Sequence, residues 1–68
     1  MSSRDRERGR AIAAHVARHG PLTLPALART FEERGYALSQ FIGGLAAAFD
    51  AGLLDRSPDP TWNVRAAP

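Results

Sequence analysis

The chain has 68 residues, the length of one small domain, and carries nine arginines against seven acidic residues for a formal net charge of +2. A domain of this size buries only about 60% of its unfolded surface, which leaves no room for both a core and a walled catalytic pocket. The absence of cysteine excludes disulfides and thiolate metal sites. No apolar run approaches the roughly 18 residues that span a membrane, and no signal peptide follows Met1, so we expect a cytoplasmic protein.

The first predicted helix occupies the N-terminal quarter of the chain. Ser2 or Ser3 can cap it, and it should end at about His19, where a Gly-Pro pair follows. Its apolar stripe is thin and consists of Ile12, Ala13, Val16 and Ala17. We expect the two ends of the chain, residues 1–10 and 66–68, to fray.

A short strand and a second helix come next. Leu22 is a single apolar residue between Pro21 and Thr23, a position that favours a short strand. Thr23 can cap the following helix, and a proline is tolerated in its first turn. The apolar residues recur at three- and four-residue spacing at Leu24, Leu27, Ala28 and Phe31. This helix should end near Arg34.

The third predicted helix begins with Ser39 as its cap and ends before Gly52. Its apolar stripe comprises Phe41, Ile42, Leu45, Ala48 and Phe49. We therefore expect Phe31, Leu45 and Phe49 to be buried together in the core.

The last third of the sequence predicts a β-hairpin. Residues 53–57 (LLDRS) and 61–65 (TWNVR) have the composition and alternation of strands, and the intervening Pro-Asp-Pro is typical of a turn. Three helices followed by a hairpin give a mainly α fold with a small β-hairpin, the order of a winged helix-turn-helix. We expect one such domain over residues 1–68, with an ordered core of about 11–65.

Two segments strengthen this prediction. The sequence GPLTLPALARTF followed by ALSQFIGGLAAAFDAGLLDR resembles the second and third helices and wing entry of small bacterial winged-helix regulators. The resemblance implies duplex DNA binding and transcriptional regulation as a dimer. Pro60-Thr61-Trp62 also resembles the wing of winged helices that bind Z-form nucleic acid. That family's third-helix asparagine and tyrosine are replaced here by Ile42 and Ala46, so only Pro60 and Trp62 carry the likeness.

The candidate nucleic-acid contacts lie outside the body of the third helix, which has no Arg or Lys from Gln40 to Leu54. We expect phosphate contacts to dominate because few side chains there could pair with base edges. The candidates are Arg29 and Arg34 on the second helix, Ser39 and Gln40 at the start of the third, and Arg56, Pro60, Trp62 and Arg65 in the wing. The alternative for Trp62 is a ring that covers the core.

A protein-interaction module is the main alternative. Gly43, Ala47 and Ala51 are spaced four apart and form a predicted outward face of small residues, which another protein or a second copy could approach closely. Abundant alanine explains the same pattern without a partner. His15 and His19 have a spacing that can bind a metal, but no third ligand is evident, so we predict no metal, cofactor or small-molecule substrate.

Overall fold

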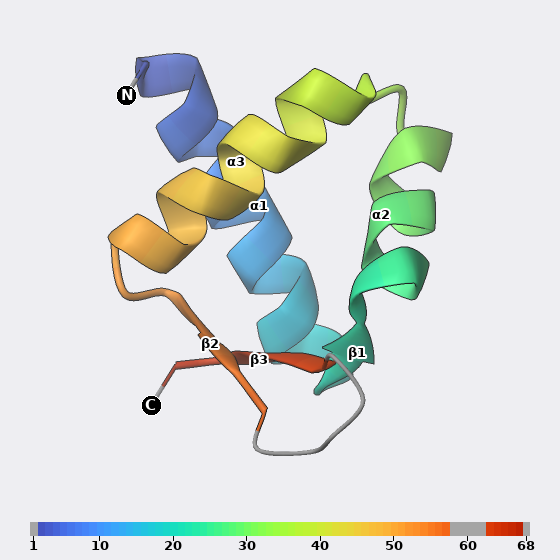
Figure 1. The fold of residues 1–68 in the computed structure, drawn as a ribbon, viewed down its shortest axis with the longest axis vertical. Helices are drawn as coiled ribbons and strands as arrows, with labels where there is room; N and C mark the ends of the chain where they lie inside the picture. Colours follow the sequence, from blue (N-terminus) through green and yellow to red (C-terminus); the bar gives the residue numbers. More distant parts are fainter. Residues whose placement is uncertain (1, 58–62, 68) are drawn as a thin grey trace.

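The computed structural model describes residues 2–57 and 63–67, and within them shows three helices and a small antiparallel sheet (Figure 1). The elements are α1 (Ser3–His19), β1 (Leu22–Thr23), α2 (Leu24–Glu33), α3 (Leu38–Asp50), β2 (Leu54–Arg56) and β3 (Asn63–Ala66). In Figure 1, α3 crosses α1, and the sheet lies at the end of the molecule where α1 finishes and α2 begins. The predicted mainly helical fold is confirmed, and its layout is compatible with a winged helix.

Helix α1 begins as predicted, because the Ser2 hydroxyl accepts a hydrogen bond from the Asp5 amide at 3.1 Å. It ends at Gly20, whose φ of 82° is readily adopted only by glycine. The prediction that residues 1–10 fray is wrong from Ser3 onward. The buried residue Gly9 lies directly against α3, and this packing holds the first turns of α1 in place.

The predicted start of α2 is also confirmed. Thr23 Oγ1 accepts a hydrogen bond from the Ala26 amide at 3.3 Å, and the proline occupies the first turn of the helix. The last residue of the helix is Glu33, followed by the cap residue Arg34, so the end lies within one residue of the predicted one. A local capping signal therefore fixes the start of α2.

Helix α3 begins one residue before the predicted cap. Its N-cap is Ala37, and the Gln40 side-chain oxygen accepts a hydrogen bond from the Ala37 amide at 2.8 Å. The prediction that Ser39 caps the helix is wrong, since Ser39 already lies within it and is exposed. Gln40 supplies the stabilising hydrogen bond instead.

The strands form one sheet in the order β1-β3-β2, with both neighbouring pairs antiparallel. The short strand predicted at Leu22 is confirmed, and it pairs with Val64. Arg56 also faces Val64 across the hairpin, whereas Asp55 faces Arg65. Because successive side chains point to opposite faces of a strand, Arg56 and Arg65 lie on opposite faces of the sheet.

The core lies between the three helices and one face of the sheet. Its fully buried members are Ile12, Val16, Leu27, Phe31 and Ala48, and Phe41, Leu54 and Val64 are nearly so. Phe31 lies at its centre, with its ring 5.0 Å from that of Tyr36 and 6.1 Å from that of Phe41. The prediction that Leu45 and Phe49 are buried with Phe31 is wrong, since both are only half-buried at the edge of this cluster.

Candidate functional site

The face of α3 that packs against α1 is made of small residues. Gly44, Ala47 and Ala48 are buried there. A Cβ atom on Gly9 of α1 would lie 2.8 Å from the Gly44 carbonyl oxygen and 3.0 Å from the Ala48 amide nitrogen. Side chains larger than these would separate the two backbones, so the small residues allow the helices to approach closely.

This contact overturns the predicted small-residue interface on α3. Ala47 is buried under α1, and a Cβ atom on Gly43 would lie 2.8 Å from a carboxylate oxygen of Asp5. Asp5 also forms an ion pair with Arg8, at 3.6 Å. Ala51 is exposed, but it lies beyond the end of α3. The three residues therefore do not form one outward face, because α1 already covers part of it.

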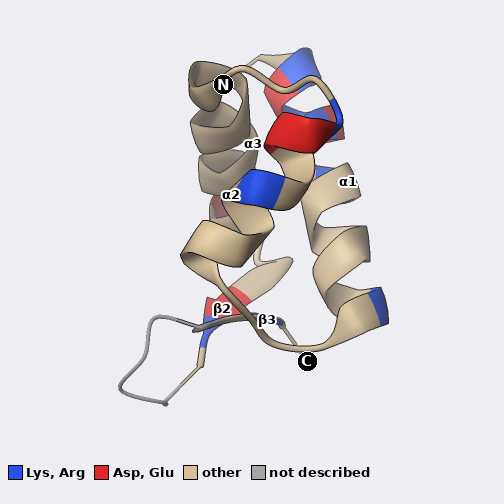
Figure 2. Ribbon diagram, turned by 90° about the vertical axis from the view of Figure 1, so that its right-hand side faces the viewer, with Lys and Arg blue, Asp and Glu red and all other residues tan. Residues whose placement is uncertain are grey.

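A second face of α3 is apolar and partly exposed. Leu38 is 70% exposed and Ile42 is 54% exposed, while Leu45 and Phe49 are half-buried. These four residues, which we call the seam, follow one another at spacings of four, three and four. The chain carries no charge from Leu38 to Phe49, and Figure 2 shows α3 uncoloured along most of its length. The seam is an uncharged apolar strip on the molecular surface.

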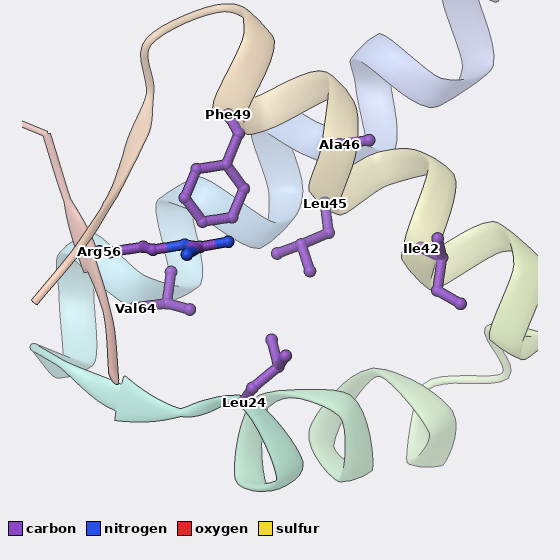
Figure 3. A pocket seen from close by; sticks show the side chains of 7 residues that line it. All are labelled: Leu24, Ile42, Leu45, Ala46, Phe49, Arg56 and Val64. Atoms are coloured by element: carbon purple, nitrogen blue, oxygen red, sulfur yellow. The ribbon is translucent and has the colours of Figure 1, made fainter. Parts of the chain in front are cut away.

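The seam borders a groove. A cavity of about 260 Å³ lies between α3, the start of α2 and the β2–β3 hairpin. Its lining residues are Leu24, Ile42, Leu45, Ala46, Phe49, Arg56 and Val64 (Figure 3). Arg56 is the only charged residue among them, and Figure 3 shows its side chain extending beside Phe49 and Val64. The groove is therefore apolar with one cation near the C-terminal half of α3.

Several predicted nucleic-acid contacts have partners inside the molecule. Arg34 Nη2 lies 3.2 Å from His15 Nδ1, and its guanidinium lies 4.8 Å from the centre of the Phe31 ring. Arg65 pairs with Asp55 at 3.8 Å across the hairpin. Gln40 supplies the hydrogen bond at the start of α3. Binding phosphate through these residues would compete with contacts that the fold already makes.

The remaining candidates do not gather on one surface. Arg29 and Ser39 are exposed, on α2 and α3 respectively. Arg56 faces the groove, on the other side of the sheet from Arg65. Pro60 and Trp62 lie outside the described residues. The structure thus brings none of these arginines together into a continuous basic stripe, which duplex binding would favour.

The two histidines lie where α1 meets the end of α2. Their ring centres are 4.3 Å apart, and the His15 ring meets Phe31 edge-on at 5.6 Å. Partial burial lowers the pKa of His15, and the nearby positive charges of His19, Arg34 and Arg18 lower it further. Because arginine can only donate, His15 Nδ1 accepts the hydrogen bond and its ring is neutral. The described part of the chain contains no group of three His, Cys, Asp or Glu residues that could hold a metal.

No protein-family model, curated protein or solved structure matches the chain. Among the described residues, no helix has the length and apolar character needed to cross a membrane. The sequence signal for the groove was the four-three-four spacing of Leu38, Ile42, Leu45 and Phe49, of which Leu38 was not included in the predicted stripe.

Proposed function

We propose that this domain is a protein-interaction module of the winged-helix type, and that it binds an amphipathic α-helix along the groove beside α3. The observation that carries the proposal is the exposure of Leu38 and Ile42 in an uncharged strip that continues into the groove. The element order, with β1 pairing with the β2–β3 hairpin, supports the winged-helix assignment.

The spacing of the seam indicates what kind of partner fits. Four, three and four are the intervals between the a and d positions of a heptad repeat, the positions that meet in helix-to-helix packing. A partner helix with apolar residues at the same intervals could insert them between Ile42, Leu45 and Phe49. Fully burying one such side chain contributes about 1.5–3 kcal/mol. An acidic residue on the partner would suit Arg56.

Duplex DNA binding is the rival proposal, and the described surface supports it less. A helix that recognises base edges needs side chains that donate and accept hydrogen bonds. On α3 only Ser39 and Gln40 have them, and Gln40 already bonds the Ala37 amide. The exposed candidates Arg29 and Arg56 would have to supply most of the phosphate contacts.

A titration followed by NMR can test the proposal. The ¹⁵N-labelled protein receives a synthetic acidic helical peptide with Leu at heptad positions a and d, and a control peptide of the same composition in scrambled order. We expect only the heptad peptide to shift the amide signals of the seam, because only it presents a continuous apolar stripe.

A second titration, with random duplex DNA, tests the alternative proposal of duplex DNA binding. DNA binding would weaken steeply with added salt and shift signals around Arg29 and Ser39. That result, with no response to the heptad peptide, would overturn the protein-interaction proposal and support duplex binding. An equal response to the two peptides would also contradict it, because the groove would then show no preference for a helical stripe.

A further inference from the structure

We infer that the helix received by the groove is α3 of a second copy of this chain, and that the two α3 helices pair antiparallel about a two-fold axis. This inference rests on the proposed function, because it names the partner for the same groove. The partner must be a helix that presents apolar residues at heptad intervals, and α3 is itself such a helix. One surface can therefore supply both halves of the contact.

The seam is self-complementary in the antiparallel orientation. A two-fold axis at the middle of α3 places Ile42 opposite Leu45 of the second copy, and Leu38 opposite Phe49 of the second copy. Each contact then occurs twice, as a closed two-fold interface requires. All four residues of the seam are matched, and none is left facing a polar residue at the opposite position.

The groove's cation decides between the antiparallel and parallel orientations. Arg56 lines the groove near Phe49, as Figure 3 shows. Leu38 and Phe49 are eleven residues apart, which is about 16 Å along a helix. Antiparallel pairing therefore places the two Arg56 side chains at opposite ends of the interface. Parallel pairing would place them at the same end, where their charges would repel.

Sedimentation velocity over a range of concentrations tests the assembly. The wild-type chain should sediment as a dimer at high concentration and dissociate on dilution. Ile42→Glu puts a charge into the centre of the seam and should leave a monomer at every concentration. Because Ile42 is largely exposed, the variant should keep its helical circular dichroism. Ala17→Glu is the matched control, since Ala17 is exposed on α1 outside the seam and the variant should still form dimers.

Disulfide formation tests the orientation, and the absence of native cysteine makes it clean. The variants Ile42→Cys and Leu45→Cys are mixed in equal amounts and oxidised, and the products are identified by mass spectrometry. A disulfide needs its Cβ atoms about 3.5–4.5 Å apart. Antiparallel pairing should give the mixed 42–45 product well above the half that random pairing yields. A majority of 42–42 and 45–45 products would overturn the antiparallel arrangement.

The outcomes separate this inference from the proposed function. A wild-type chain that stays monomeric at millimolar concentration, yet binds the heptad peptide in the groove, would overturn the second copy as partner and keep the proposed function. A monomer that ignores the peptide would overturn both. A dimer that Ile42→Glu leaves intact would overturn the seam as its interface.

Discussion

The two long faces of α3 differ in residue size, and the larger residues lie on the outside. The inner face places Gly44, Ala47 and Ala48 against α1, with backbones too close for larger side chains. The outer face presents Leu38 and Ile42 to the surface. In most surface helices the large apolar residues face the core. The reversal along much of α3 indicates that close packing determines the inner face, and the proposed partner would account for the outer one.

The largest effect that separates the two faces should come from the neighbouring residues Phe41 and Ile42. Phe41 is only 4% exposed, whereas Ile42 is 54% exposed. We expect Phe41→Ala to lower the free energy of unfolding by about 3–5 kcal/mol, because it leaves a cavity beside Phe31. Ile42→Ala should change it by no more than about 0.5 kcal/mol. Urea denaturation of the two variants, at concentrations low enough to keep the chain monomeric, measures both values.

If Phe41→Ala and Ile42→Ala lowered the free energy of unfolding by similar amounts, α3 would have to be rotated relative to this structure. At the usual stability of about 0.05–0.15 kcal/mol per residue, a domain of this size has about 3–10 kcal/mol in total. Phe41→Ala should therefore also lower the melting temperature by many degrees, which thermal unfolding would detect independently.

Most of the fold could be predicted from sequence because its boundaries depend on local chemistry. Ser2 and Thr23 cap their helices as expected, and Leu22 forms the short strand. The orientation of α3 could not be predicted in this way. Its periodicity fits the larger residues Leu45 and Phe49, but the close approach of Gly9 on α1 turns the small residues inward. That contact joins segments far apart in the chain and leaves no local signal.

The candidate site was less accessible to sequence reasoning for the same reason. Arg34 and Arg65 suggested phosphate contacts as long as their partners were unknown. Their partners, His15 and Asp55, are brought to them by packing and by strand register. The groove also depends on residues from three separate elements, and periodicity within one helix cannot reveal it.

An intermediate effect should come from adding one methyl group to glycines on the two helices. Gly9→Ala places a Cβ atom 2.8 Å from the Gly44 carbonyl oxygen, a backbone atom that cannot move without shifting α3. We expect it to lower the free energy of unfolding by about 1–3 kcal/mol despite the better helix propensity of alanine. Denaturation with urea would measure the loss.

Gly43→Ala is the matched control. The new Cβ atom would lie 2.8 Å from a carboxylate oxygen of Asp5, the end of a flexible side chain that can turn away. The propensity gain of up to about 1 kcal/mol should then remain, so the variant should be neutral or slightly stabilised. A stabilising Gly9→Ala would contradict the close approach of α1 to the small residues of α3.

The smallest expected effect is a pH dependence that involves the fold but not the seam. His15 has an ordinary pKa of 6.5, and burial with its positive neighbours lowers that pKa in the folded chain. Between the two values the unfolded chain binds a proton that the folded chain does not, so stability falls as the pH drops below about 6.5. Above that pH the His15 contribution is constant, and below the folded pKa the decline stops.

Replacing His15 separates its contribution to the pH dependence of stability from that of the carboxylates. The free energy of unfolding of His15→Gln should change less with pH than that of wild type between pH 7.5 and 5.5. Glutamine does not titrate but can still accept a hydrogen bond from Arg34. His19→Gln should keep a His15 contribution that is weakened by the loss of one positive neighbour.

The seam contains no titratable side chain from Leu38 to Phe49, so the dissociation constant of the proposed dimer should not depend on the protonation of His15. Equal pH slopes in wild type and His15→Gln would show that the ring is not held neutral by the fold. If the dissociation constant of the wild-type dimer depended on pH and that of His15→Gln did not, the His15 site and the seam would be coupled.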